Sequence, residues 1–243
     1  MSLAHCTLAK ECAFCVVAHA LSTEKLEVMG LLFGRWDGSH ALIEEAHPLA
    51  RTDRRADRVE VKPEQLAKAA SIAESRGLRI VGWYHSHPGY GCWMSGIDCS
   101  TQMLNQQYTE PFLAIVIDPV RTCAAGKVEI GAFRTYPQGY KPPEEAQSKY
   151  QTIPTSKIED FGVHANQYYS LDVSFFKSGL DARTLDVLWN KYWVNTLSSS
   201  PLRTNRAFIG EQLSDLARKM DQAESHAAQA GRIGGLRIGG APG

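Results

Sequence analysis

The sequence predicts an α/β or α+β fold, in which strands and helices interleave around one core. Short apolar runs bounded by glycine or proline alternate along the chain with segments whose apolar residues recur at helical spacing. A length of 243 residues with 44% hydrophobic content is enough to bury a full core. We therefore expect one large domain, or one domain with an appended segment.

The chain is expected to begin with a helix and a β-hairpin. Apolar residues within 13–21 lie on one face of a helix. The apolar run from Val28 to Phe33 predicts a strand, and Asp37-Gly38 is a hairpin turn signal that joins it to a second strand over residues 41–46. A strand that opens a hairpin in this way places the residues just before Val28 at one end of the sheet.

A loop, a helix and a strand are expected next. The stretch from Arg51 to Arg58 is dense in charge and predicts a loop. Pro63 is a typical first helical residue, and Gly77 closes the helix that it begins. The following run from Leu78 to Tyr84 predicts a strand, at whose end two histidines stand.

The second half of the chain continues the alternation and ends in helices. The expected elements are a helix over 98–108, strands over 112–117, 127–133 and 168–176, and helices over 180–197 and 206–228. Residues 137–154 are rich in Pro, Gln and Ser, which suggests a surface insertion. The last thirteen residues hold six glycines and too few core-forming side chains to offset the entropy of ordering them, so we expect a disordered tail.

The charge balance limits the possible partners. Lys plus Arg and Asp plus Glu both number 26, so no general attraction to nucleic acid or to anionic membranes is expected. No apolar run approaches the roughly 18 residues that span a bilayer, and Lys10 and Glu11 interrupt any signal peptide. Cys12 and Cys15 form a lone C-x-x-C pair in an apolar segment, which favours packing and free thiols in a reducing compartment. We expect an intracellular protein.

The most informative motif is His85-Ser-His87-Pro88 followed by Ser95-Gly-Ile-Asp98. Two histidines at i and i+2 point to the same side of a strand, and the glycines after Pro88 let the chain turn back so that Asp98 can join them. Three protein ligands leave one position of a zinc ion open for water, which such a site makes nucleophilic near neutral pH. The motif therefore predicts a hydrolytic zinc site of His85, His87 and Asp98.

A proton acceptor near such a water completes the chemistry. Glu27 is the candidate, since it directly precedes an apolar strand and can project over a neighbouring strand end, but position alone does not choose it over Glu24, Glu44 or Glu45. The Ser95-x-x-Asp98 spacing also fits a helix-capping arrangement, which is compatible with metal binding by Asp98.

Two other interpretations of this region are weaker. Cys92 is not expected to act as a fourth ligand, because a closed site would exclude water, nor as a nucleophile, because the nearby histidines are engaged by metal. Trp83 and Trp93 flank the motif and are expected to wall the site or pack beneath it. A zinc deaminase would need His-x-Glu and Pro-Cys-x-x-Cys, and the chain has neither.

The combination of Glu27-x-Met-Gly-x-x-x-Gly34 with His85-Ser-His87-Pro88 and Ser95-Gly-Ile-Asp98 resembles the JAMM (MPN+) zinc isopeptidase family. The resemblance implies an MPN domain, a cytidine-deaminase-like mixed β-sheet flanked by helices, with one Zn²⁺ per chain. It implies that Glu27 deprotonates the zinc water and that Ser95 hydrogen-bonds the tetrahedral oxyanion. The bond cut would join a ubiquitin-like modifier to a lysine of its target.

Two branches of the family are mixed in this chain. Residues 82–230 resemble the signalosome branch, which removes a NEDD8-type modifier from cullins, whereas residues 13–66 resemble the deubiquitinase branch of the BRISC and BRCA1-A complexes. The implied partners are neddylated cullin or ubiquitin chains, and an MPN-type subunit within a multi-protein complex, in cytoplasm and nucleus. The alternative is a non-catalytic MPN scaffold, which the intact Glu27, His85, His87, Ser95 and Asp98 argue against.

The resemblance also divides the chain and suggests regulation. The expected parts are a catalytic core over 1–136, a surface insertion over 137–165, the end of the MPN domain over 166–200, a C-terminal helix over 201–230 and a glycine-rich tail over 231–243. Family members are often inhibited alone, with a loop that blocks the zinc. The charged stretch from Arg51 to Arg58 is the candidate for such a gate.

Overall fold

The structure is a computed structural model that describes residues 4–23, 26–50, 62–140, 142, 153–176, 178–180, 182–183 and 206–235. Its strands are β1 (His5–Ala9), β2 (Met29–Trp36), β3 (His40–Leu49), β4 (Arg79–Ser86), β5 (Leu113–Ile117), β6 (Ile130–Thr135) and β7 (Tyr168–Phe176). Its helices are α1 (Lys10–Leu21), α2 (Pro63–Ser75), α3 (Gly96–Tyr108), α4 (Pro119–Ala125), the 3₁₀ turn η2 (Thr155–Lys157), α5 (Ile158–His164) and α8 (Arg206–Gly235).

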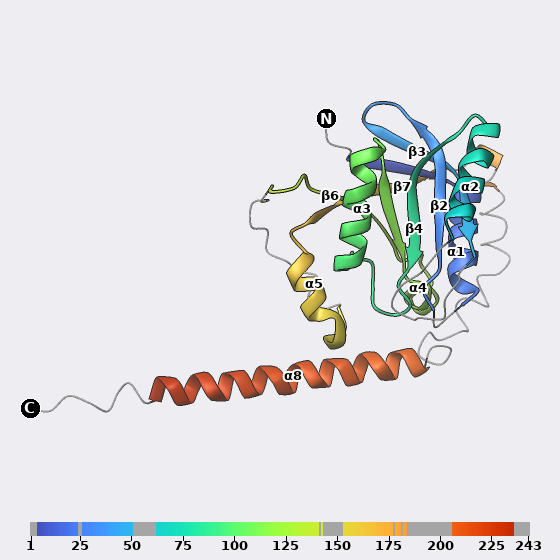
Figure 1. Cartoon of the computed structure of the whole chain (residues 1–243). Helices are drawn as coiled ribbons and strands as arrows, with labels where there is room; N and C mark the ends of the chain where they lie inside the picture. The colour runs from blue at the N-terminus through green and yellow to red at the C-terminus, as the bar shows by residue number, and fades with distance from the viewer. Residues whose placement is uncertain are drawn as a thin grey trace, which may run out of the picture.

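The strands form one mixed sheet in the order β1-β3-β2-β4-β5-β6-β7, which closes on itself because β1 also pairs with β7 (Figure 1). The β2–β3, β2–β4, β5–β6 and β6–β7 pairs are antiparallel, whereas β4–β5, β1–β3 and β1–β7 are parallel. The predicted α/β class, a mixed sheet flanked by helices, is confirmed. Closure of the sheet was not expected, since β1 was not recognised from its five residues.

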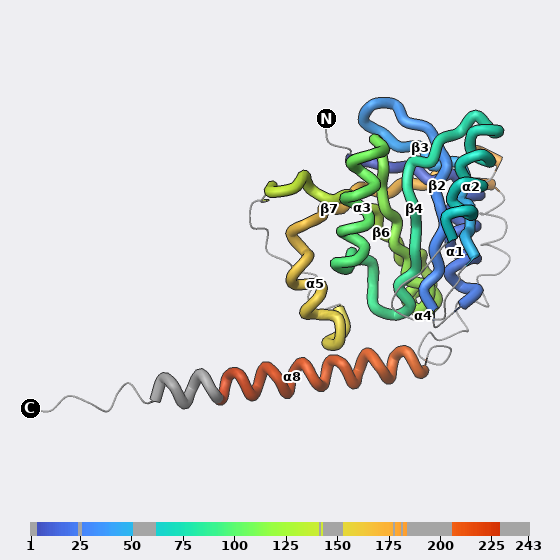
Figure 2. Tube along the Cα trace, in the orientation of Figure 1, coloured from blue at the N-terminus to red at the C-terminus, as the bar shows by residue number. Residues whose placement is uncertain are grey.

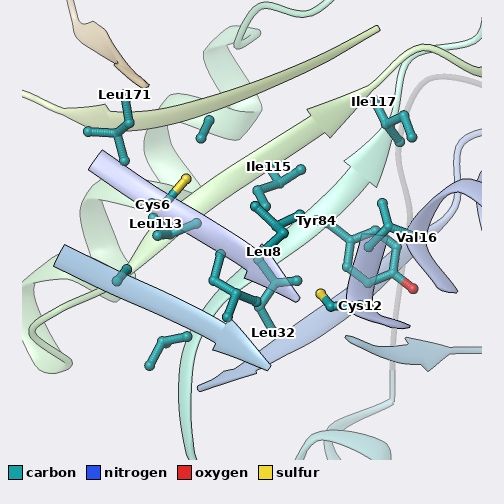
Figure 3. Close-up of a cluster of buried hydrophobic side chains, with 14 of the residues drawn as sticks. Cys6, Leu8, Cys12, Val16, Leu32, Tyr84, Leu113, Ile115, Ile117 and Leu171 are labelled. Carbon is teal, nitrogen blue, oxygen red and sulfur yellow. The ribbon is translucent and has the colours of Figure 1, made fainter. Parts of the chain in front are cut away.

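Each face of the sheet packs its own set of apolar side chains, as the two-residue period of a strand requires. Along β5, Leu113, Ile115 and Ile117 belong to an inner core that includes one face of α1, while Ala114 and Val116 belong to an outer layer. Figure 3 shows the inner side chains converging between the strands and α1. Residues of β5 are buried on both faces, which explains its continuous apolar sequence.

The outer layer is covered by α2 and α3, and this decides where the motif residues lie. The layer contains Ala69 and Ala73 of α2, Cys99 of α3 and Trp83 of β4. His85 and His87 follow Trp83 at intervals of two residues along an extended chain, so both histidines point toward the side on which α3 packs. The chain runs down β4, turns at the lower end of the sheet and climbs back through α3 (Figure 2).

Most of the elements expected from the sequence are present, with ends shifted by a few residues. The helix predicted over 98–108 begins at Gly96, and the last helix ends at Gly235 instead of near residue 228. The helices α4 and α5 were not expected. The predicted loop over 51–58 and nearly all of the predicted helix over 180–197 lie outside the described residues, as do residues 236–243 of the tail.

The segment of η2 and α5 packs against the body of the protein near the lower end of α3. Ile153, Phe161 and Trp93 form a small buried cluster there. Below this segment lies α8, a long helix that extends away from the sheet and touches η2 (Figure 1). None of the helices within the described ranges is both long and apolar enough to cross a membrane.

Candidate metal centre

His85, His87 and Asp98 meet at the lower end of β4, where all three side chains are buried. The Nε2 atoms of the two histidines are 3.0 Å apart, and Asp98 Oδ2 lies 3.3 Å from His85 Nε2 and 3.6 Å from His87 Nε2. Among the described residues, this is the one group of three or more His, Cys, Asp or Glu side chains that could hold a metal ion. The ligand set expected from the sequence is thus brought together.

Asp98 is held in place by the beginning of α3. Ser95 is the N-cap of this helix: its hydroxyl accepts a hydrogen bond from the Asp98 backbone N–H, and its own backbone N–H donates to Asp98 Oδ2 at 2.9 Å. The Ser95 hydroxyl also donates to Asp98 Oδ2 at 2.7 Å. One carboxylate therefore closes a capping box and faces the histidines, as the spacing predicted.

The three side chains are electrostatically coupled. Burial opposes a charged imidazole, yet the Asp98 carboxylate outweighs it and raises the pKa of His85. In turn, His85 and His87 hold the pKa of Asp98 well below its usual value, although burial alone would raise it. Asp98 is therefore an anion at neutral pH, which is the protonation state that a metal ligand needs.

The loop after Pro88 orients His87 through its backbone. His87 Nδ1 lies 3.0 Å from the carbonyl oxygen of Gly91, which can only accept, so Nδ1 carries the proton and Nε2 offers its lone pair. Asp118, fully buried, accepts from the backbone N–H groups of Gly89 at 2.9 Å and Gly91 at 2.8 Å. Both glycines have positive φ, 89° and 87°, so the loop needs residues without a side chain there.

Glu27 reaches the centre because β2 pairs with β4. In this antiparallel pair Met29 lies opposite His85, and the pairing continues as Ser86 N–H donates to the Val28 carbonyl at 3.0 Å. The Val28 N–H donates in return to the Ser86 hydroxyl at 2.9 Å. Glu27, the residue before Val28, thus stands beside the end of β4 and is itself buried.

Tyr90 links Glu27 to the histidines. Its hydroxyl donates a hydrogen bond to Glu27 Oε1, and its ring stacks on His87 with centroids 4.5 Å apart. The competing carboxylates lie on β3, where Glu44 pairs with Arg35 and Glu45 with Arg76. Glu24, the remaining alternative, lies outside the described residues.

Aromatic side chains enclose the histidines. Trp83 stacks on His85 with centroids 4.6 Å apart and donates to Gln102, while Trp93 meets His87 edge-on. Both indoles are buried, in agreement with a role as walls. Cys92 turns away from the ligands, donating to the Glu129 carbonyl, and burial raises the pKa of its thiol. All six cysteines are free thiols.

Three residues that support the site were not found by sequence reasoning. Ser86, Tyr90 and Asp118 have no role that can be read from local spacing, because their partners are 58, 63 and up to 29 residues away. The Asp118-Pro119 pair did carry a signal, since Asp before Pro is typical of a helix N-cap, and Asp118 does cap α4. Its second function, holding the glycine loop, depends on the β4–β5 pairing.

The fold and the site define an α/β domain of the MPN type with a candidate metal centre. Residues 1–111 match the family model of the JAB1/Mov34/MPN/PAD-1 ubiquitin proteases, and residues 198–240 match that of the Cop9 signalosome subunit 5 C-terminal domain. Residues 1–111 of the chain are therefore a JAB1/MPN-type domain, and residues 198–240 are similar to the C-terminal domain of that signalosome subunit.

Curated relatives are similar over most of the chain. COP9 signalosome complex subunit 5b of Arabidopsis thaliana is 57% identical over 225 residues, which cover 91% of this chain and 63% of the relative. COP9 signalosome complex subunit 5 of Oryza sativa is 57% identical over 88% of this chain and 60% of the relative. Subunit 5 of Drosophila melanogaster is 56% identical over 86% of this chain and 65% of the relative. The chain thus spans somewhat less than two thirds of the length of these relatives.

Proposed function

We propose that the chain is a zinc-dependent isopeptidase that removes a NEDD8-type modifier from lysines of cullins. The observation that carries this proposal is the meeting of His85, His87 and Asp98 with Glu27 at one end of the sheet. The relatives are subunits of the COP9 signalosome complex, and the family model is that of a ubiquitin protease, which supports this class of substrate.

The ligand atoms fit zinc. Tetrahedral zinc with bonds of about 2.0–2.2 Å places neighbouring ligand atoms about 3.3 Å apart. The separations among His85 Nε2, His87 Nε2 and Asp98 Oδ2 are 3.0, 3.3 and 3.6 Å. Two imidazoles and one carboxylate are a catalytic donor set, and the bound ion would supply an acidified water and polarise the scissile carbonyl.

The protein's own residues then move the proton and hold the charge. Glu27, oriented by Tyr90, accepts a proton from the attacking water and delivers it to the leaving lysine amine. Ser95 donates its hydroxyl to the oxyanion that forms at the scissile carbonyl. In the structure this hydroxyl donates to Asp98 Oδ2, so it rotates toward the substrate when the carbonyl arrives.

The division of labour along the chain follows from the same proposal. Residues 1–136 and 166–200 would make up the catalytic domain, while α8 would join a multi-subunit complex that includes an MPN-type partner. The match of residues 198–240 to a signalosome C-terminal domain supports the second part. Exposed Leu213, Leu216 and Met220 give α8 an apolar surface for such contacts.

The test measures zinc content together with cleavage of neddylated cullin and of ubiquitin chains, with and without an MPN-type partner. Glu27→Gln should retain stoichiometric zinc and lose cleavage by about 100-fold or more, since it keeps the acceptor for Tyr90 but no longer takes a proton. Glu44→Gln on β3 is the matched control and should change neither. Zinc binding without cleavage of either substrate, even with the partner, would favour the non-catalytic MPN scaffold.

Preference between modifiers is decided in the same experiment. Faster cleavage of ubiquitin chains than of neddylated cullin would assign the substrate to the branch that residues 13–66 resemble. A wild-type chain that binds no stoichiometric zinc would end the enzymatic proposal.

A further inference from the structure

Asp215 is the one buried side chain between residues 206 and 228 of α8, at 8% exposure. Buried carboxylates are uncommon unless they are paired, and Asp215 has several partners. Its Oδ1 accepts from the Thr155 backbone N–H at 2.8 Å and from the Thr155 hydroxyl at 2.6 Å. The Lys219 ammonium lies 3.0 Å from its other oxygen and also donates to the Ile153 carbonyl.

Asp215 thus serves as the cap of a helix to which it does not belong. Thr155 is the first residue of η2, and the first backbone N–H groups of a helical turn have no partner within the turn itself. The Asp215 carboxylate of α8 accepts a hydrogen bond from the first of them, that of Thr155, and Lys219 donates to the carbonyl of Ile153. The same face of α8 is therefore fixed to the chain at both sides of Pro154.

The segment that begins at Thr155 reaches the metal centre at three points. The Lys157 ammonium lies 5.1 Å from the centroid of the Tyr90 ring. Phe161 packs edge-on against Trp93 with centroids 5.8 Å apart. Asp160 Oδ1 accepts from the backbone N–H of Gly96 at 3.2 Å, which secures the first turn of α3 from outside.

Each of these contacts is made with a residue that touches or adjoins a residue of the candidate site. Tyr90 donates to Glu27, Trp93 meets His87, and Gly96 directly follows Ser95. The approach of α5 to α3 is close: a Cβ added to Gly96 would lie 2.5 Å from the His164 ring. A shift of α5 would therefore shift the residues of the site that it contacts.

We propose that Asp215 is a positioning residue of the metal centre, which acts by capping η2 and so holding η2 against Tyr90 and α5 against Trp93 and Gly96. The seating of α8 then sets the orientation of Glu27 and Ser95. A partner that moved α8 would change the site without touching it. The catalytic part of this inference rests on the proposed function, whereas the mechanical coupling does not.

The experiment compares Asp215→Asn and Thr155→Val in the 243-residue chain with Asp221→Asn, an exposed aspartate of the same helix. Amide hydrogen exchange is measured for segments 88–98, 113–117 and 153–164. Both test variants should speed exchange in 153–164 and in 88–98 by about fivefold or more, and leave β5 protected. Thr155→Ser, which keeps the hydroxyl, should restore the protection, and Asp221→Asn should match the wild type.

Turnover supplies the second readout. With an active wild type, both test variants should lower kcat about three- to tenfold and change KM less than about twofold, because substrate contacts remain while the reacting groups are misaligned. The double variant should be no slower than the slower single variant, as expected for residues that act through one contact. Thr155→Val preserves side-chain shape and carries the test if Asp215→Asn loses protection in β5 as well.

Two results would overturn the proposal. The first is faster exchange confined to 153–164 with 88–98 unchanged, which would make Asp215 an attachment point only. The second is faster amide hydrogen exchange in 88–98 together with an unchanged kcat. An inactive wild type would count against the proposed function alone, since the exchange measurement still decides the coupling.

Discussion

Replacing Asp118 by Asn should weaken metal binding although Asp118 is not a ligand. The carboxylate is fully buried and accepts three backbone hydrogen bonds, from Gly89 and Arg121 on Oδ1 and from Gly91 on Oδ2. Asn has one acceptor oxygen, and its best placement keeps the two bonds on Oδ1. Its NH₂ group then faces the Gly91 N–H, so two donors meet.

The magnitude follows from these bonds. A buried N–H left without an acceptor costs about 1–3 kcal/mol, and loss of the charge weakens the remaining bonds, for a total of about 2–4 kcal/mol. The carbonyl of Gly91 accepts from His87 Nδ1, so displacement of this loop removes the group that orients the ligand. Loss of such a partner lowers metal affinity by about 10–100-fold.

Two measurements check this prediction: thermal unfolding of the metal-free chain, and zinc affinity by competition with a chelator. We expect Tm to fall by about 5–15 °C, as such a loss implies for a domain of this size, and zinc affinity to fall as above. The control is Asp172→Asn, whose side chain is 84% exposed on β7. A lowered Tm with zinc affinity within about twofold of wild type would refute the role of the glycine loop in orienting His87.

Three further predictions address the loop, the helix cap and the thiols. Gly91→Ala should destabilise the chain by about 1–3 kcal/mol in urea unfolding and should weaken zinc binding. The reason is that the φ of Gly91 is 87° and the new Cβ would lie 2.9 Å from an arginine nitrogen. The control is Gly126→Ala, which also has a positive φ but lies in open space, and it should cost about 1 kcal/mol and leave zinc binding unchanged. Although burial would raise it, hydrogen bonds hold the pKa of Asp215 below its ordinary value of about 3.9, so its stabilising effect is complete above that pH and is lost as the pH falls further. The stability difference between wild type and Asp215→Asn should therefore be constant from about pH 7 to 4 and shrink below; a difference that shrinks at neutral pH would contradict this. Maleimide should label exposed Cys123 first and spare Cys12, whose pKa burial raises to about 12, as peptide mapping after a short reaction can show.

The order of elements could be predicted where a local pattern specifies them. The hairpin signal at Asp37-Gly38, Pro63 at the start of α2 and Gly77 after its end act within a few residues of the chain, and the structure has each of them. The strand β1 and the helix α5 escaped prediction because each is short. They are stabilised by pairing and packing with segments far away in sequence.

By itself, the sequence determined the donor set of the metal centre. His85 lies on β4 and His87 directly follows the last residue of that strand, while Ser95 and Asp98 are three residues apart at a helix start. The geometry within each pair is therefore set by the strand end and by the first helical turn. Only the tertiary structure decided which glutamate joins them and what holds them. The β2–β4 register places Glu27 at the end of β4, while the packing of α5 brings residues 155–161 against the site. Such contacts depend on the summed packing of the whole sheet, which no short stretch of sequence encodes.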